Sequence, residues 1–149
     1  MGFLNNLLGG SQEENLIKAI DDNNYDLVKE LLSKVANLNF ITQNGANPLM
    51  KSMFSDNREI FQLLINSGSN INFTSNNGYS PLIVGCVQND LDRVRLLLSK
   101  GGNVHQKTKL GWTSLLKASE NPIYASENFD SFDFKKIEAD LKNSNPNQE

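Results

Sequence analysis

The sequence predicts an all-α protein in which about four helix–turn–helix units of 33 residues stack side by side into a solenoid. Three observations support this prediction. Residue types recur every 33 positions, each period contains two short segments with helical hydrophobic spacing, and glycines and polar residues separate those segments. One such unit cannot bury its own apolar face, whereas stacked neighbours can.

Comparison of the chain with itself yields the repeat length. Glycines, leucines and other apolar residues recur at intervals of 33, and so many coincident series do not arise by chance in 149 residues. The series are Gly45, Gly78 and Gly111; Leu16, Leu49, Leu82 and Leu115; Leu31, Leu64 and Leu97; Val28, Phe61 and Val94; Leu38, Ile71 and Val104; and Gly68 and Gly101.

The first helix of each period begins at a polar cap. Residues 47–49 (Asn-Pro-Leu) and 80–82 (Ser-Pro-Leu) place a side-chain acceptor before a proline, whose missing N–H has no cost in the first turn. Residues 113–115 (Thr-Ser-Leu) keep the cap without the proline. Short polar breaks at residues 55–57 and 88–90 then separate this helix from the next one.

The second helix of each period carries apolar residues at helical spacing, as in residues 60–65 and 91–98. Gly68 and Gly101 end these helices, because glycine readily takes the left-handed conformation that follows a helix. An extended apolar–polar pair and a polar turn then lead to the glycine of the next period.

The ends of the chain differ from the middle units, as the caps of a solenoid must. We expect the first unit to begin near Gln12, with its second helix over residues 25–34. A helix over residues 113–120 is followed by Pro122, which breaks the register and predicts an insertion in the last unit. The predicted limits are 1–11 for a short amphipathic or disordered segment, 12–142 for the repeat domain (units 12–41, 42–74, 75–107 and 108–142), and 143–149 for a disordered tail.

These residues resemble the ankyrin repeat family. The family pattern Gly-x-Thr-Pro-Leu-His is echoed at residues 45–49, 78–82 and 111–115, and its Leu-Leu-x-x-Gly-Ala-Asp-Val-Asn pattern at 63–72 and 96–105. The resemblance covers about residues 13–120 and implies an ankyrin-repeat solenoid with hairpin-like turns. The family's histidine is replaced by Met50, Ile83 and Leu116, so its hydrogen bonds across the turns are missing.

The composition argues against several classes of function. A net charge of -3 without any run of Lys or Arg argues against nucleic-acid binding. No apolar run approaches the roughly 20 residues of a membrane span. Residues 3–8 are amphipathic but lack basic residues, so their binding to a membrane surface should be weak; packing on the first repeat, or mobility, is the other interpretation. A single cysteine, Cys86, cannot form an internal disulfide, and we expect a cytoplasmic protein that is a monomer when unbound.

The sequence contains no pattern typical of catalysis or metal binding. His105 occupies the place of Asn39 and Asn72 one and two repeats earlier, and no Cys or carboxylate lies at ligand spacing, so we interpret it as a turn residue. Cys86 is interpreted as a small core residue. Phosphate-binding glycine loops and nucleophile–base sets are absent from the sequence. We therefore predict no enzymatic activity, metal, cofactor or small-molecule substrate.

The family resemblance implies that a partner protein contacts a concave groove built from the turn tips and the inner helices. Ala46, Tyr79 and Trp112 lie one repeat apart, which predicts a line of side chains along this groove; aromatic side chains dominate many interfaces. Packing of Trp112 against the neighbouring turn or Tyr124 is the alternative. The predicted partner-binding residues are Gln43, Asn44, Ala46, Phe54, Asn76, Asn77, Tyr79, Gln88, Lys109, Leu110, Trp112 and Tyr124.

The sequence thus favours a protein–protein interaction module without catalysis. The alternative is a stand-alone inhibitor or immunity protein, which neutralises a cognate enzyme or toxin by covering its active site. The lack of a recognisable effector domain in the sequence motivates this alternative, because an inhibitor needs only one binding surface.

Overall fold

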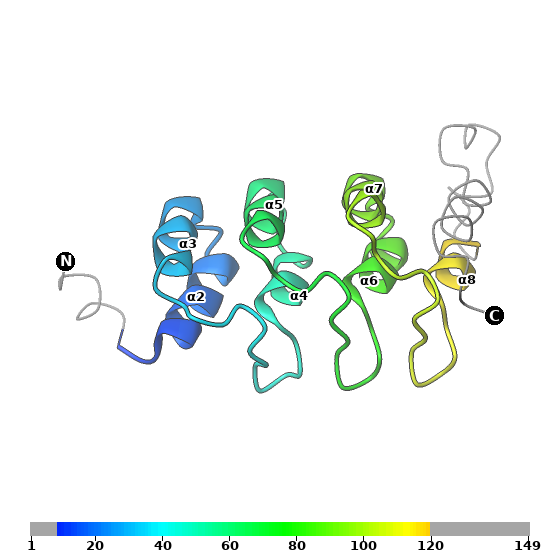
Figure 1. Ribbon diagram of the computed structural model, residues 1–149, viewed down its shortest axis with the longest axis horizontal. Helices are drawn as coiled ribbons and strands as arrows, with labels where there is room; N and C mark the ends of the chain where they lie inside the picture. Colours follow the sequence, from blue (N-terminus) through cyan, green and yellow to red (C-terminus); the bar gives the residue numbers. More distant parts are fainter. Residues whose placement is uncertain (1–8, 120–149) are drawn as a thin grey trace.

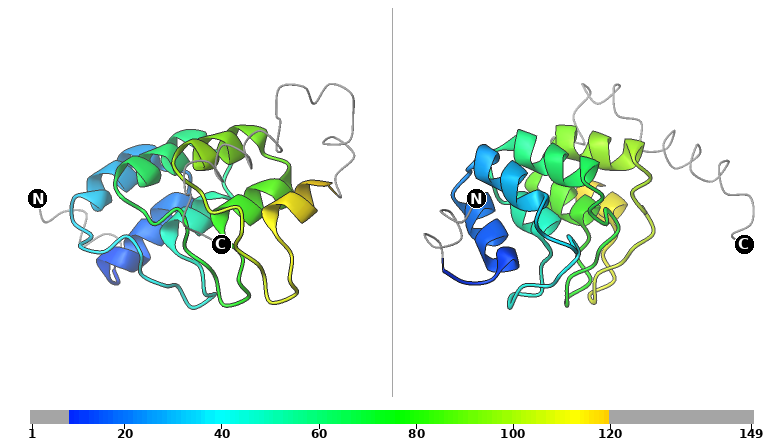
Figure 2. Two further views of the ribbon diagram at one scale, coloured as in Figure 1. Left: turned by 45° about the vertical axis from the view of Figure 1, so that its right-hand side comes forward. Right: turned by 60° about the vertical axis from the view of Figure 1, so that its left-hand side comes forward.

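The computed structural model describes residues 9–119, which form two rows of short helices with a row of turns beneath them (Figure 1). Helices α2, α4, α6 and α8 form the inner row, next to the turns, and α3, α5 and α7 form the outer row (Figure 2). No strand occurs in this part of the chain. The helices are α2 (Gln12–Asp21), α3 (Tyr25–Leu32), α4 (Pro48–Ser52), α5 (Arg58–Asn66), α6 (Pro81–Gln88), α7 (Leu91–Ser99) and α8 (Ser114–Ser119).

Side-chain caps explain where the inner helices begin. At α2 the backbone N–H of Glu14 donates to Ser11 Oγ at 3.1 Å, and the Glu14 carboxylate accepts from the Ser11 N–H at 2.9 Å. Asn47 and Ser80 accept from the backbone N–H three residues ahead, at 2.8 and 3.3 Å. Each such cap contributes about 1 kcal/mol to helix stability. The structure therefore confirms the predicted caps of α4 and α6.

The core lies between the two rows and continues from one helix pair to the next. Leu16, Leu49 and Leu82, which share one position of the repeat, are all buried. Each fully buried leucine contributes about 1.5–3 kcal/mol relative to an exposed one. Close packing also requires a small residue at Gly85, since a Cβ there would lie 2.9 Å from Val94 Cγ2. Residues that recur every 33 positions in the sequence thus occupy equivalent buried positions in the core.

Asparagine side chains link successive turns. Asn39 Oδ1 accepts a hydrogen bond from the Asn70 N–H at 2.8 Å, and Asn72 Oδ1 accepts one from the Asn103 N–H at 2.7 Å. The two bonds are equivalent under the repeat, so the same link recurs between neighbouring units. His105 occupies the next equivalent position, where it is exposed within a turn, as the sequence interpretation placed it.

Arg93 is a buried cation that joins the second helix pair to the third. Its Nη1 atom donates to the Met53 carbonyl at 3.1 Å and lies 3.3 Å from the Asp90 carboxylate. Its other terminal nitrogen donates to the Ser55 carbonyl, and the guanidinium stacks 5.3 Å from the centre of the Phe61 ring. Burial lowers the pKa of Arg93. The hydrogen bonds and the aspartate compensate for taking this charge out of water.

Two boundaries differ from the sequence prediction. Helix α3 ends at Leu32 rather than at residue 34, because the Ser33 hydroxyl and N–H both bond to the Glu30 carbonyl and close the last turn. Helix α8 begins at Ser114, one residue later than expected, with Thr113 accepting from the Leu116 N–H. The predicted N-terminal segment up to residue 8, the insertion after Pro122 and the tail lie outside the described residues.

Candidate functional site

A hollow lies where α2 meets the first turn. Its volume is about 490 Å³, and its floor includes the apolar side chains of Ile17 and Phe40. The Lys51–Asp21 ion pair, with 3.0 Å between nitrogen and oxygen, bridges α4 and α2 at its wall. The residues that line it are Glu13, Glu14, Ile17, Lys18, Asp21, Phe40, Ile41, Thr42, Gln43, Asn44 and Lys51. One side of α2, together with Lys51 of α4, therefore faces the first turn.

Equivalent positions in the next units extend this surface along the stack, because the chain repeats every 33 residues. Lys51 lines the hollow from α4, and the exposed Phe54 lies two residues beyond the last residue of that helix, Ser52. Val87 is equivalent to Phe54 one repeat later and is exposed in the last turn of α6. We call this surface, together with the tips of the turns at residues 41–46, 74–79 and 107–112, the turn face.

The structure places the predicted partner-binding residues in two groups. Ala46, Tyr79 and Trp112 are partly buried, and the first two pack against the core. Tyr124 lies outside the described residues. Eight others are exposed: Gln43, Asn44, Phe54, Asn76, Asn77, Gln88, Lys109 and Leu110. The line of three residues therefore forms the base of the turns more than their outermost surface.

Trp112 is held by its own unit. Its backbone N–H donates to Thr108 Oγ1 at 3.1 Å, and its carbonyl accepts from the Thr108 N–H at 2.9 Å. The ammonium group of Lys117 lies 3.3 Å from the centre of the indole ring. A cation over an aromatic face is an attractive contact. The structure thus brings a predicted binding residue together with a lysine that the sequence analysis did not select.

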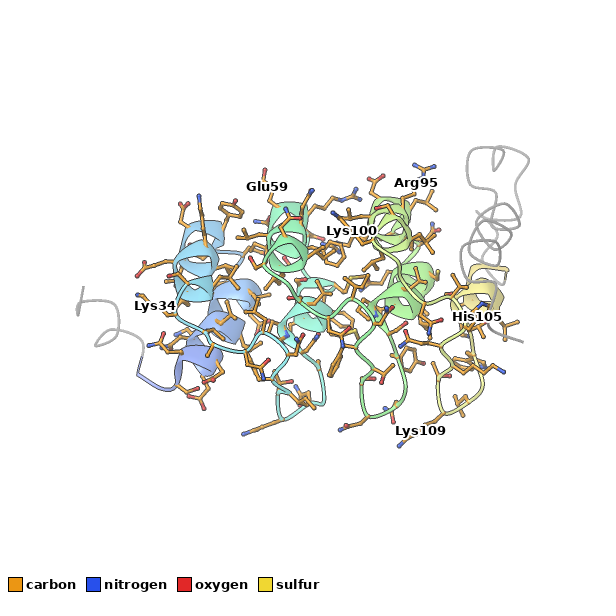
Figure 3. The ribbon with its side chains drawn as sticks, in the orientation of Figure 1. Lys34, Glu59, Arg95, Lys100, His105 and Lys109 are labelled. Carbon is orange, nitrogen blue, oxygen red and sulfur yellow. The ribbon has the colours of Figure 1, made fainter. Side chains whose placement is uncertain are left out.

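The third turn is fixed against the second. The Lys109 N–H donates to the Asn77 carbonyl at 2.9 Å. Gly78 has a φ of +81°, and a Cβ on it would lie 2.9 Å from the Lys107 carbonyl oxygen. Glycine is required there because both the left-handed backbone and the contact exclude a side chain. These contacts fix the turn whose tip carries Lys109 (Figure 3).

Sequence reasoning missed several residues of the turn face. Ile41 is 62% exposed beside the hollow, and Lys51 lines it from α4. Ile41, Thr74 and Lys107 occupy the same position of the 33-residue repeat, so the sequence could have placed Ile41 at the edge of a turn. The sequence could not predict that α2 lines the hollow, because this depends on how closely the first turn approaches that helix.

The described residues contain one cysteine and no cluster of metal-ligating side chains. Cys86 is buried, and burial raises the pKa of its thiol to about 12, so the thiol is protonated at neutral pH and is a poor nucleophile. Within residues 9–119 no group of three His, Cys, Asp or Glu side chains could hold a metal ion. A search of the same residues for a helix long and apolar enough to cross a membrane found none.

Comparison with known proteins agrees with the geometry. A family model described as ankyrin repeats (3 copies) matches residues 16–108 and, in a second alignment, residues 55–128. A search of curated proteins found no match to the chain. The matched residues span most of the chain and contain the helix pairs and turns described above. The chain therefore belongs to the ankyrin repeat family.

Proposed function

We propose that this protein is an interaction module that holds a partner protein on its turn face and performs no catalysis. Ankyrin repeats are generally protein–protein interaction modules. The observation that supports the proposal is a set of large apolar side chains that are exposed on the turns and near the ends of the inner helices α4 and α6. Phe54 is 72% exposed, Leu110 71%, Ile41 62% and Val87 52%. Grouped exposed apolar residues mark interaction sites more often than isolated ones do.

The energetics of this surface are sufficient for binding. Burial of one large apolar side chain contributes about 1.5–3 kcal/mol. Two or three such residues, buried together at the centre of an interface, can supply most of its binding energy. The turns are already fixed by hydrogen bonds to their neighbours, such as the bond from Lys109 to Asn77, so little ordering is needed when the partner binds.

The test uses a partner captured from the native cell extract, identified by mass spectrometry and then purified. Its dissociation constant is measured by titration calorimetry for the natural chain and for the Phe54→Ser/Leu110→Ser variant. We expect this variant to bind about a hundredfold more weakly, equivalent to about 2.7 kcal/mol. The matched control is Glu59→Ala/Gln62→Ala on α5 of the outer row, where Figure 3 shows Glu59 pointing away from the turns.

Equal affinities of the natural chain and the Phe54→Ser/Leu110→Ser variant would place the partner on another surface and refute the proposal. The same purified partner separates a scaffold from an inhibitor. If the partner is an enzyme or toxin whose activity falls in step with the bound fraction, the inhibitor form of the function holds. Unchanged activity at saturation identifies a binding module without that role.

We also propose a reducing, cytoplasmic setting and a monomeric free state. Cys86 is the chain's one cysteine, and it is buried as a free thiol. Such a residue needs no oxidising compartment. Light scattering of the purified chain at increasing concentration measures the oligomeric state, and a mass that doubles with concentration would contradict the monomer.

A further inference from the structure

Charge is distributed unevenly along the described stack. Residues 93–119 contain six Lys or Arg residues and no Asp or Glu, although the whole chain has a net charge of -3. Three of these cations, Lys107, Lys109 and Lys117, belong to the last described turn and to α8. Lys107 and Lys109 are exposed, and Figure 3 shows Lys109 at the tip of that turn. The turn face therefore has a positive end.

The remainder of the turn face is different in charge. Residues 60–89, which include the second turn and α6, contain no charged residue. At the far end, the hollow beside α2 has charges of both signs, and Lys51 is neutralised there by Asp21 at 3.0 Å. Glu13 and Glu14 add two more carboxylates to that wall. The turn face thus changes from mixed charge through neutral to positive.

The positive end also has apolar surface. Leu110 is 71% exposed and directly follows Lys109 at the turn tip. Trp112 is partly exposed and has the Lys117 ammonium group 3.3 Å from its ring centre. This contact holds a positive charge beside the apolar surface without burying it in the core. We call Lys107, Lys109, Leu110, Trp112 and Lys117 the cationic end.

We propose that the cationic end binds an acidic segment of the partner protein, with carboxylates next to Lys107 and Lys109 and an apolar side chain against Leu110 and Trp112. The inference rests on the proposed function, since it names the chemistry of the partner that the turn face takes. Complementary charge determines which partner binds and how fast it associates. A basic segment would meet like charges at this end.

Charge along the turn face favours a protein segment over an extended polyanion. A nucleic acid carries one negative charge at each phosphate and is held by rows of Lys and Arg. Here the excess of positive charge lies at one end, while the neutral α6 region and the hollow, with Glu13 and Glu14 in its wall, follow along the stack. A short acidic segment fits one end without reaching the other.

The test measures fluorescence anisotropy of three labelled peptides of about ten residues with the full-length chain. One peptide alternates acidic with Leu and Phe residues, the second has Ser and the third has Lys at the acidic positions. We expect the acidic peptide to bind about tenfold more tightly than the neutral one, and the basic peptide more weakly than both. This preference should shrink as salt is raised to about 0.5 M, because salt screens exposed charges.

Charge reversal locates the site. In the Lys107→Glu/Lys109→Glu variant we expect the acidic peptide to bind at least about tenfold more weakly. The matched control is Lys29→Glu/Lys100→Glu, which makes the same change of charge at two other exposed lysines. Lys29 lies on α3, and Lys100 directly follows α7. The affinity of this control should stay within about twofold of the natural chain. Circular dichroism confirms that both variants are folded.

In the peptide measurements, the inference is overturned by equal binding of acidic and neutral peptides, by no binding of any peptide, or by equal losses in the two charge-reversal variants. The proposed function is judged separately, by the binding of the intact partner to the Phe54→Ser/Leu110→Ser variant. If that variant loses the partner while the peptides show no acidic preference, the turn face binds proteins and this inference alone fails.

Other occupants are distinguished in the same assay. Tighter binding of single-stranded DNA or of vesicles rich in phosphatidylserine than of the acidic peptide would overturn the inference in their favour. The chain's own acidic residues Glu127, Asp130 and Asp133 lie outside the described residues. If Glu127→Gln/Asp130→Asn/Asp133→Asn in the full chain binds the acidic peptide about tenfold more tightly, the chain itself occupies the site, and the partner assignment fails.

Discussion

The two ends of the turn face share one backbone plan and differ in chemistry. Near α2, the first turn encloses a hollow of about 490 Å³ whose walls carry both signs of charge. Near α8, the third turn presents Lys109 and Leu110 at an exposed tip where the first turn has Gln43 and Asn44. The repeat fixes where these positions lie but leaves their side chains free. Binding specificity in this stack therefore belongs to individual residues and not to the fold.

The largest expected effect comes from breaking the core that both ends share. Phe61 is 1% exposed and also stacks against Arg93, so Phe61→Ala should lower the free energy of unfolding by about 3–5 kcal/mol. Phe54→Ala is the matched control, because that phenylalanine is exposed and its loss should change stability by less than about 0.5 kcal/mol. Urea denaturation measures both. Similar losses in the two variants would contradict the burial pattern.

The next effect concerns the contact that places one turn against another. Gly78→Ala combines a left-handed backbone with a Cβ only 2.9 Å from the Lys107 carbonyl oxygen, and we expect a loss of about 2–3 kcal/mol. Gly111 has the same φ of +81° but no described atom within 4 Å of a new Cβ, so Gly111→Ala should lose about 1 kcal/mol. Thermal unfolding compares the two. Equal losses of stability in the two variants would mean that the contact between the second and third turns does not contribute to the cost of Gly78→Ala.

A titration tests the burial of Cys86 on α6, between the two ends. Burial raises the pKa of Cys86 from 9.0 to about 12, so the folded state retains the thiol proton above pH 9 while the unfolded state releases it. This contribution to stability is complete below pH 9 and is lost as the pH rises toward 12. We expect the natural chain to lose about 1 kcal/mol more than Cys86→Ala between pH 9 and pH 10. Parallel pH profiles would show that water reaches the thiol.

The smallest expected effect comes from a substitution that makes the charge of the hollow beside α2 more like that of the cationic end. Asp21→Asn removes the partner of Lys51 and leaves the hollow more positive. In the Lys107→Glu/Lys109→Glu background, where binding at the cationic end is lost, we expect Asp21→Asn to raise the affinity of the hollow for the acidic peptide about two- to fivefold, because a partly exposed charge contributes about 0.2–1 kcal/mol. Asp22→Asn removes a neighbouring exposed carboxylate that does not line the hollow and serves as the control. The same gain in both would indicate a general charge effect.

The repeat, its helices and their caps could be predicted because they depend on residues close together in the sequence. Asn47 and Ser80 act on N–H groups three residues away, and Leu49 and Leu82 lie on a period that the chain itself displays. The end of α3 at Leu32 was missed although it is also local, because Ser33 closes that helix without the glycine that ends the later helices.

The sequence predicted where the residues of the candidate site lie in each repeat, but not how far each side chain is exposed. Leu110 and Phe54 were selected from their register, and both are exposed. Tyr79 was also selected, yet it packs partly against the core. A register assigns a residue to a turn, whereas the exposure of its side chain depends on the neighbouring unit.

The sequence by itself determined the all-α repeat, the capped helix starts and the charge of each turn tip. Only the tertiary structure decided that Arg93 is buried against Phe61 and bonded to the Met53 carbonyl, 40 residues earlier in the chain. The hollow between α2 and the first turn was decided in the same way. The physical reason is distance: caps and periods are short-range, whereas a buried cation and a hollow exist only after segments far apart in sequence have packed together.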